Sequence, residues 1–237
     1  MSIYARSAAY YDALLRAQGK DYAGESARVR EIIEEHKTSG GNALLDVACG
    51  TGMHVSYLRE SYVCEGLDVD RAMLSIAAER LHDIPLHAQD MIGFNLGARF
   101  DAIVCLFSGI GYVPNGRLLD QTLETFAKHL MPGGVAVVEP WIRPHQWQDG
   151  YIDAKFADEP DVKVARMSVN RRDGNVSIVN FNYMVAASDG VRTFAEPHRL
   201  VLFTDEEYRR AFERARFDLA YDPVGLTGRG LFIGRKR

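Results

Sequence analysis

The stretch Leu44-Leu45-Asp46-Val47-Ala48-Cys49-Gly50-Thr51-Gly52 organises the rest of the chain. Its first residues form a short apolar run that predicts a buried strand, and the residues after Gly52 have the pattern of a helix. Gly50 and Gly52 adopt backbone angles that other residues resist, and they let the backbone come close to a ligand. Open α/β folds bind ligands at such turns, at the carboxyl edge of a parallel sheet. The stretch therefore predicts a strand, a ligand-binding turn and a helix.

Strands and helices alternate along the chain after this turn. Short apolar runs predict parallel strands at 43–47, 63–67, 86–88, 100–107 and 135–138. Apolar residues at helical spacing predict helices at 53–60, 70–81 and 118–130. This alternation is typical of a doubly wound α/β fold with helices on both faces of the sheet. Two final runs, 217–221 and 231–234, are expected to complete a mostly parallel, seven-stranded sheet as a hairpin.

Additional structure is expected on both sides of this core. Residues 7–37 have the pattern of two helices. Between 151 and 203 the pattern changes to alternating extended runs, at 162–169, 176–186 and 192–203, which predict an inserted antiparallel sheet. Thr204-Asp205-Glu206-Glu207 then has the form of a capping box that opens a helix. The expected organisation is an N-terminal helical cap (1–37), a core domain (38–144 and 203–237) and an auxiliary antiparallel sheet (145–202).

The composition excludes several classes of protein. The formal net charge of -4 argues against a broad nucleic-acid-binding surface. No apolar stretch approaches the roughly 20 residues of a membrane helix, and the first residues lack the pattern of a secretory signal. The three cysteines, Cys49, Cys64 and Cys105, are expected to be buried thiols in the reducing cytoplasm. The histidines show no metal-ligand spacing, so no bound metal is expected.

The glycine-rich turn favours one class of cofactor. A dinucleotide fold normally shows GxGxxG, but Val55 stands at the third glycine position. Asp46, four residues before Gly50, suits a cationic or zwitterionic ligand better than a pyrophosphate. S-adenosylmethionine carries an ammonium, a carboxylate and a sulfonium. The pattern therefore predicts a Rossmann-like, class I methyltransferase that binds this cofactor through Asp46, Gly50 and Gly52.

Further cofactor contacts are expected at the ends of the next strands. Asp68 follows the second strand, 22 residues after Asp46, where a carboxylate accepts hydrogen bonds from both ribose hydroxyls. Asp90 follows the third strand and is expected to accept from the adenine amino group. Met73 and Met91 are expected to flank the adenine ring.

Six segments spread over nearly the whole chain carry a resemblance to a known family: Gly19-Lys20-Asp21-Tyr22, LLDVACGTGMH at 44–54, Phe107-Ser108-Gly109-Ile110-Gly111-Tyr112, Val137-Val138-Glu139-Pro140-Trp141, His198-Arg199-Leu200 and Gly228-Arg229-Gly230-Leu231-Phe232. With them the chain resembles the nucleotide-sugar N,N-dimethyltransferases that complete dimethylamino sugars of the desosamine and mycaminose type. The resemblance implies a dTDP-linked amino-deoxyhexose as substrate and its mono- or dimethylated amine as product. It implies S-adenosylmethionine as donor, S-adenosylhomocysteine as by-product, and a homodimer.

The resemblance also implies roles for individual side chains. Besides the residues already named, those expected at the cofactor are Tyr11, Tyr22, Ala48 and Phe107. Tyr4 and Arg229 would hold the diphosphate side, and Glu25 would lie near the sugar and attract its ammonium group. Trp141, which borders the inserted sheet, is expected to line the sugar pocket.

Tyr112 and Ser108 are the candidates for the chemistry. Some relatives carry a histidine near the transferred methyl where this chain has Tyr112. The donor is already activated, so positioning is the main task, and a sugar ammonium beside a sulfonium releases its proton more readily. We therefore expect no dedicated strong base. Three other functions stay open at this point: a small-molecule O- or C-methyltransferase, a nicotinamide-dependent dehydrogenase, and a sensor that binds the cofactor without turnover.

Overall fold

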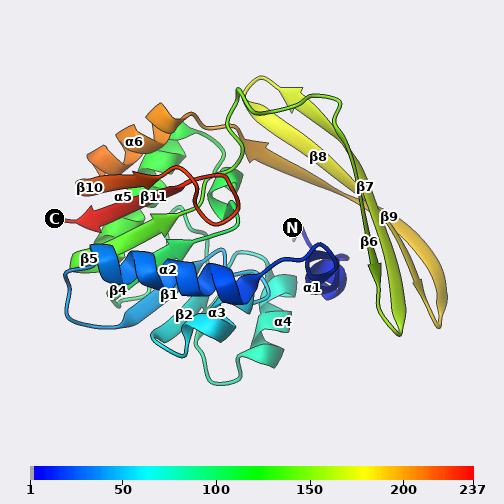
Figure 1. Cartoon of the computed structure of the whole chain (residues 1–237), viewed down its shortest axis with the longest axis horizontal. Coiled ribbons are helices and arrows are strands. Elements are labelled where there is room, and N and C mark those ends of the chain that lie inside the picture. Colours follow the sequence, from blue (N-terminus) through cyan, green and yellow to red (C-terminus); the bar gives the residue numbers. More distant parts are fainter. Residues whose placement is uncertain (1–2) are drawn as a thin grey trace.

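A seven-stranded sheet forms the centre of the computed structural model, which describes residues 3–237 (Figure 1). Its strands are β1 (Ala43–Val47), β2 (Val63–Leu67), β3 (Leu86–His87), β4 (Phe100–Cys105), β5 (Leu130–Val138), β10 (Phe217–Asp222) and β11 (Leu231–Lys236). They lie in the order β10-β11-β5-β4-β1-β2-β3. The strands β1 to β5 run parallel, and β11 pairs antiparallel with β5 and β10. The carboxyl ends of β1 to β5 therefore lie at one edge of the sheet.

Helices cover both faces of this sheet because neighbouring strand residues point to opposite sides. Leu44, Ala102 and Val137 join one hydrophobic cluster, and Leu45 and Ile103 join the other. The first cluster includes residues of three helices: α2 (Tyr22–His36), α3 (Met53–Leu58) and α4 (Arg71–Arg80). The second includes residues of α5 (Gly116–His129) and α6 (Asp205–Arg214). The predicted doubly wound core is confirmed.

A second, antiparallel sheet extends from the core on one side (Figure 1). Its four strands follow one another in sequence and in space: β6 (Ile152–Asp158), β7 (Val162–Asp173), β8 (Val176–Ala187) and β9 (Gly190–Val201). The first helix, α1 (Ala8–Ala17), packs Ala13 and Leu14 against Val164, Tyr183 and Val185 of this sheet. Helix α1 therefore lies between the antiparallel sheet and the core, as Figure 1 shows.

Some element boundaries differ from the sequence-based expectation. Strand β6 was not expected as a separate strand, because its large apolar residues, Ile152 and Phe156, are exposed and its inward positions include Asp153 and Lys155. Strand β4 ends at Cys105 instead of continuing to 107, because Phe107 adopts a positive φ of 49°. Strand β5 begins at Leu130 rather than at 135.

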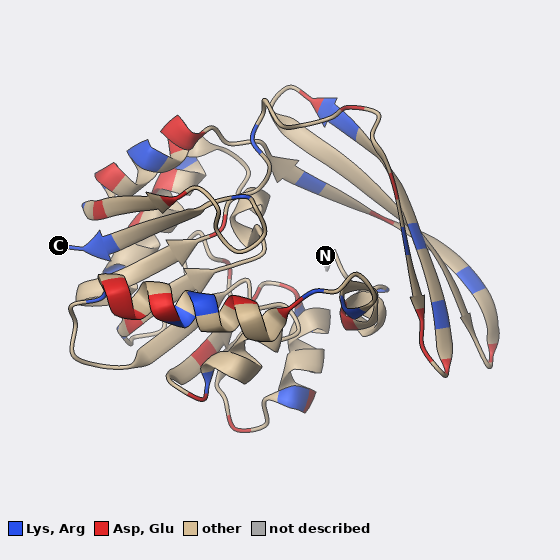
Figure 2. Cartoon of the chain, viewed as in Figure 1, with Lys and Arg blue, Asp and Glu red and all other residues tan. Residues whose placement is uncertain are grey.

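Further sequence-based expectations can be compared with the structure. Thr204 and Glu207 form the capping box at the start of α6. All three cysteines are buried and free. Lys and Arg positions are interspersed with Asp and Glu positions along the ribbon (Figure 2). Within the described residues, no helix is both long and apolar enough to cross a membrane.

Candidate functional site

The glycine-rich turn after β1 is shaped for close approach of a ligand. Gly52 precedes α3 with a φ of 75°, and a Cβ there would lie 2.5 Å from Cδ1 of Leu81. Gly50 also has a positive φ, of 56°, but a Cβ on it would meet nothing within 4 Å. Glycine at 52 is therefore needed for packing of the protein itself, whereas glycine at 50 leaves open space beside the backbone.

Asp46 is a buried carboxylate without a hydrogen-bond donor. It is 1% exposed, and neither of its oxygens has a partner among the described residues. Burial, and then the negative charge of Asp68, raises its pKa well above the usual range. A carboxylate in this state gains most from a ligand that brings N–H donors or a positive charge.

Asp68 holds the turn from the end of β2. Its Oδ2 accepts from the backbone N–H of Gly50 at 2.9 Å, and its Oδ1 accepts from the N–H of Asp70 at 2.8 Å. Burial raises the pKa of Asp68, although these backbone hydrogen bonds oppose the shift. Asp70 in turn caps α4 and accepts from the backbone N–H of Tyr4 at 3.0 Å. The N-terminal segment is thereby tied to the carboxyl edge of the sheet.

The residues expected around adenine occupy different environments. Met73 is buried in the first turn of α4, and Met91 is partly buried against the core. Asp90 is exposed, and its Oδ1 accepts from the backbone N–H of Ile92 at 2.9 Å. Ala48 lies in the turn after β1 with a φ of 59°. Their contacts to a nucleoside stay predictions.

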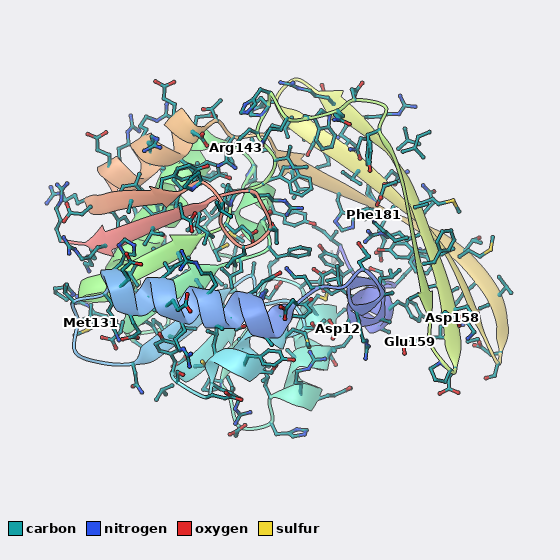
Figure 3. All side chains as sticks on the ribbon, viewed as in Figure 1. Asp12, Met131, Arg143, Asp158, Glu159 and Phe181 are labelled. Atoms are coloured by element: carbon teal, nitrogen blue, oxygen red, sulfur yellow. The ribbon has the colours of Figure 1, made fainter. Side chains whose placement is uncertain are left out.

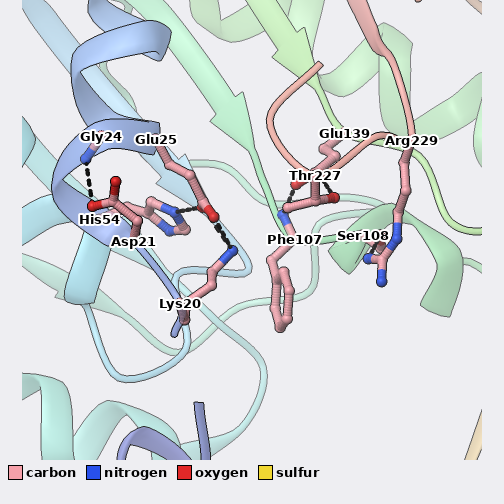
Figure 4. A network of polar contacts seen from close by, with 10 residues as sticks. All are labelled: Lys20, Asp21, Gly24, Glu25, His54, Phe107, Ser108, Glu139, Thr227 and Arg229. Atoms are coloured by element: carbon pink, nitrogen blue, oxygen red, sulfur yellow. Dashed lines mark hydrogen bonds and ion pairs between the residues drawn. The ribbon is translucent and has the colours of Figure 1, made fainter. Parts of the chain in front are cut away.

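A compact ion cluster lies where α2 meets the turn (Figure 4). Lys20 Nζ lies 2.6 Å from both carboxylate oxygens of Glu25, and His54 Nε2 lies 2.9 Å from Oε2. Burial raises the pKa of Glu25, but the hydrogen bonds from His54 and Lys20 and the charge of Lys20 outweigh it and lower the pKa overall. Glu25 is thus already paired, and its expected attraction for the substrate ammonium stays a prediction. The ring of Tyr22 packs edge-on against His54, at 4.9 Å.

Helix α1 contacts the same turn. Asp12, labelled in Figure 3, accepts from the Thr51 hydroxyl at 2.7 Å and pairs with Arg80 of α4 at 2.7 Å. Tyr11, the residue before Asp12, is half-buried and packs edge-on against Tyr4, with ring centroids 5.6 Å apart. The predicted tyrosines of the N-terminal segment therefore do lie at the carboxyl edge of the sheet.

A left-handed backbone turn follows β4 and carries Phe107 and Ser108. The backbone N–H of Phe107 donates to Glu139 Oε2 at 2.6 Å, and the Thr227 hydroxyl donates to the other oxygen of Glu139 (Figure 4). Ser108 Oγ donates to the carbonyl of Pro140 at 2.8 Å and accepts from Arg229 at 2.7 Å. Ser108 is therefore fully engaged, which is the pattern of a residue that positions Arg229.

Arg229 is a cation without a carboxylate partner among the described residues. Its guanidinium lies 5.0 Å from the ring centroid of Trp141 and 5.6 Å from that of Phe107. Burial lowers its pKa, although the charge of Glu139 opposes this shift, and an arginine remains protonated. Trp141 is fixed by its indole N–H, which donates to Ser177 Oγ at 2.9 Å. An anionic group of a ligand would complete this part of the site.

Tyr112 belongs to a chain of three side chains. Its hydroxyl lies 2.9 Å from that of Tyr4 and 2.6 Å from Nδ1 of His198 on β9. The sequence analysis assigned no role to the side chains of His198, Glu139 or Thr227. The only signal was that His198 and Glu139 lie in segments that carry the family resemblance.

The site fits the predicted cofactor in two independent ways. The unpartnered oxygens of Asp46 suit its ammonium group, and the open space beside Gly50 suits close passage of the nucleoside along the backbone. Asp68 keeps further lone pairs that can accept from ribose hydroxyls. The donor set is therefore consistent with a nucleoside that carries positive charge.

Comparisons with known proteins agree with this chemistry. Residues 44–134 match the family described as methyltransferase domain. The chain is 42% identical to dTDP-3-amino-3,6-dideoxy-alpha-D-glucopyranose N,N-dimethyltransferase of Streptomyces fradiae, over 94% of this chain and 88% of the relative. It is 38% identical to dTDP-4-amino-2,3,4,6-tetradeoxy-D-glucose N,N-dimethyltransferase of Saccharopolyspora spinosa, over 94% of this chain and 90% of the relative.

A solved structure extends the likeness to three dimensions. CalS10 of Micromonospora echinaspora, a SAM-bound amino pentose methyltransferase involved in calicheamicin biosynthesis, is similar to the chain with a TM-score of 0.86 and 37% identity. The match covers 96% of this chain and 97% of CalS10. It includes both sheets, so the antiparallel sheet is part of the shared architecture.

Proposed function

The chain belongs to the family of dTDP-amino-sugar N,N-dimethyltransferases, and on this premise we propose that it transfers two methyl groups in turn to the amine of a dTDP-linked amino-deoxyhexose. It is an S-adenosylmethionine-dependent N-methyltransferase. The dehydrogenase, the O- or C-methyltransferase and the cofactor sensor are set aside, because these relatives are N-methyltransferases over nearly their whole length.

One observation carries the substrate class. Among residues 3–237, the site combines a buried carboxylate that meets no hydrogen-bond donor, Asp46, with a half-buried arginine that meets no carboxylate, Arg229. The first complements a cationic methyl donor, and the second complements the diphosphate of a nucleotide sugar. The Phe107 ring lies between two cations, with its centroid 3.9 Å from Lys20 Nζ and 5.6 Å from the Arg229 guanidinium. A neutral acceptor such as a free phenol would leave Arg229 unpaired.

The residues around the site position the reactants more than they react. Bound S-adenosylmethionine supplies a methyl group on a sulfonium, which an amine lone pair attacks directly. Tyr4, Tyr11 and Tyr112 surround the acceptor position with aromatic faces, which favour cations, and with hydroxyls. The sugar ammonium loses one proton before each transfer, and we infer that water or the tyrosine hydroxyls carry it away without a strong base.

The chain is also proposed to form a homodimer through the outer face of the antiparallel sheet. On this face Ile152, Phe156, Met167 and Met184 are 73%, 65%, 47% and 50% exposed. They lie on β6, β7 and β8, where Ile152 pairs with Val169 and Met184 with Ala165. An apolar face of this kind favours a self-complementary contact between two copies. The free thiols fit a reducing compartment, so the proposed location is the cytoplasm.

Mass spectrometry of the products tests the proposed activity. The protein is incubated with S-adenosylmethionine and a panel of dTDP-linked sugars with an amine at C3, an amine at C4 or a hydroxyl only. We expect mass gains of one and then two methyl groups for one amine regioisomer, and none for the hydroxyl sugar. Methylation of phenols but of no amino sugar would overturn the proposal.

A further inference from the structure

A hydrogen-bonded chain runs from the N-terminal segment to the antiparallel sheet. Tyr4, Tyr112 and His198 come from the N-terminal segment, η1 (Gly109–Tyr112) and β9. The Tyr4 and Tyr112 hydroxyls are 2.9 Å apart, and the Tyr112 hydroxyl is 2.6 Å from His198 Nδ1. Three segments separated by 86 or more residues thus meet at two hydroxyl oxygens beside the proposed acceptor position.

His198 is enclosed on the inner face of the antiparallel sheet. It is 1% exposed, and its Nε2 has no partner within residues 3–237. Its ring packs against Tyr4 at 5.0 Å and against Phe181 of β8 at 4.9 Å. The label in Figure 3 places Phe181 on the side of the sheet that faces α1.

The charged groups near His198 come from the neighbouring strands. Arg166 of β7 lies over the Phe181 ring at 4.2 Å and is 3.8 Å from Asp153 of β6. Glu196, two residues before His198 on β9, accepts from the backbone N–H groups of Arg6 and Ser7. Among these neighbours the positive charge of Arg166 is the one that opposes protonation of the imidazole.

A neutral imidazole determines which group donates and which accepts at each step of the hydrogen-bonded chain Tyr4–Tyr112–His198. Burial, and then the charge of Arg166, lowers the pKa of His198 to about 4. One nitrogen of a neutral imidazole accepts and the other donates. A phenol is a stronger acid than a neutral imidazole N–H, so Tyr112 donates to Nδ1. The Tyr112 oxygen then accepts from Tyr4, and the remaining lone pairs of both oxygens are free to accept.

We propose that His198 is a positioning residue for the methyl transfer, and that it acts by holding the oxygens of Tyr112 and Tyr4 as acceptors for the N–H groups of the substrate amine. The proposal rests on the proposed function. Acceptors on the N–H groups aim the nitrogen lone pair at the incoming methyl. No bond to His198 forms or breaks, and it holds no extra proton.

This arrangement has its largest consequence in the second methylation. A neutral primary amine has two N–H groups, and either can be held by an acceptor. The monomethylated amine has one, so its orientation depends on one hydrogen bond. The neutral dimethylated amine has none and loses this contact, which favours its release.

The test compares two substitutions at this position by time-resolved mass spectrometry of the sugar. His198→Leu removes the acceptor, and His198→Asn keeps an oxygen that can accept from Tyr112. We expect His198→Leu to slow the second transfer about 10-fold more than the first, the loss of one hydrogen bond, and to accumulate the monomethylated product. His198→Asn should restore most of the normal ratio between the rates of the second and the first methyl transfer. Tyr183→Phe removes a hydroxyl on the same face of the sheet that is not part of the Tyr4–Tyr112–His198 hydrogen-bonded chain. This change should leave the ratio of the two transfer rates unchanged.

A second measurement does not depend on turnover. Nitrogen NMR of the folded protein should show His198 neutral, with the proton on Nε2, from about pH 6 to 9. A protonated His198, a proton on Nδ1, or an unchanged ratio of the two steps in folded His198→Leu would overturn the proposal. Equal defects in folded Leu and Asn variants would also overturn it. These results differ from failure of the proposed function, in which the unmodified enzyme would methylate no amino sugar.

Discussion

Glu139 Oε2 accepts a 2.6 Å hydrogen bond from the backbone N–H of Phe107, a residue held at a φ of 49°. Its Oε1 accepts from the hydroxyl of Thr227. Glu139 is fully buried at the end of β5. One carboxylate therefore joins the left-handed turn after β4 to the loop that carries Arg229.

Removing this carboxylate should loosen both segments. We expect Glu139→Ala to lower the free energy of unfolding by about 2–4 kcal/mol, because a buried N–H and a hydroxyl lose their acceptor. The KM for the nucleotide sugar should also rise, since the loop that carries Arg229 loses its anchor at Thr227. Denaturant titration and steady-state kinetics measure the two effects. Thr227→Val releases only the loop, so it should raise this KM while the Kd of the cofactor stays the same; an unchanged KM in both variants contradicts this role.

Asp46→Asn should separate cofactor binding from stability. We expect the Kd of S-adenosylmethionine to rise about 10- to 100-fold, the loss of a charge-assisted contact. Calorimetry measures this change. The Tm of the ligand-free protein should instead increase by a few degrees, because the change removes a buried carboxylate that has no donor in the part of the chain that the structure describes.

The gain in Tm for Asp46→Asn should depend on pH. The pKa of Asp46 is raised in the folded protein, so its folded state holds the proton more tightly than the unfolded state does. The protein with Asp46 therefore loses stability as pH rises from about 4, the ordinary aspartate pKa, through the raised folded value. The Tm difference between the two proteins should therefore be larger at neutral pH than below about pH 4. A constant difference contradicts an ionisation at this position.

Tyr112→Phe tests whether a strong base is needed. We expect the rate to fall about 10-fold, since the hydroxyl orients the amine, and far less than the roughly 10⁴-fold upper range of general-base catalysis. Burial already raises the pKa of Tyr112, so it is not ionised near neutral pH. The profile of rate against pH should therefore keep its shape in the variant. A loss near 10⁴-fold, or a lost limb of the profile, would show that Tyr112 is a base.

Much of the fold can be predicted from local sequence patterns, whereas the candidate site can be predicted only in part. Continuous apolar runs such as Val135–Val138 predict strands that are buried on both faces. The turn from Asp46 to Gly52 predicts a cofactor-binding edge, because the backbone angles it needs are set by its own residues. Strand β6 was not predicted from the sequence, because Phe156 points outward, where its burial would depend on a partner chain. The extended pattern there shows no inward apolar face.

The less predictable site residues act across long sequence separations. Glu139 and Thr227 are 88 residues apart, and Tyr112 and His198 are 86 apart. No spacing rule connects such pairs, because their contact depends on how β5, β9, η1 and the loop after β10 are assembled. The left-handed backbone at Phe107 could not be predicted from the sequence either, since large side chains rarely adopt this conformation without tertiary support.

Oligomeric state can be tested on the outer face of the antiparallel sheet. Phe156→Asp places a charge among exposed apolar side chains on β6. We expect this change to shift the protein from dimer to monomer in light scattering, because burial of an unpaired charge at the contact is unfavourable. Val63→Asp, an equally exposed change at the start of β2, is the matched control and should leave the mass unchanged. A dimer that survives Phe156→Asp and Met184→Asp uses another surface.

Arg229→Gln tests how the nucleotide sugar is held. The guanidinium is fixed by Ser108 and by the rings of Trp141 and Phe107, so it is preorganised for an anion. We expect the KM for the nucleotide sugar to rise about 10- to 100-fold with little change in kcat, because the diphosphate lies away from the transferred methyl. Arg229→Lys should recover only part of the loss, since one ammonium cannot reproduce the planar fork.

The matched control for Arg229 lies on β11, the strand that follows the Arg229 loop. Arg235→Gln removes an exposed arginine of β11 that pairs with Asp218, and it should leave both kinetic constants unchanged. Raising the salt concentration should weaken substrate binding by the unmodified enzyme more than by Arg229→Gln, because only the former depends on the arginine–diphosphate attraction. If Arg229→Gln lowers kcat and leaves KM unchanged, the arginine acts at the reacting centre and the diphosphate binds elsewhere.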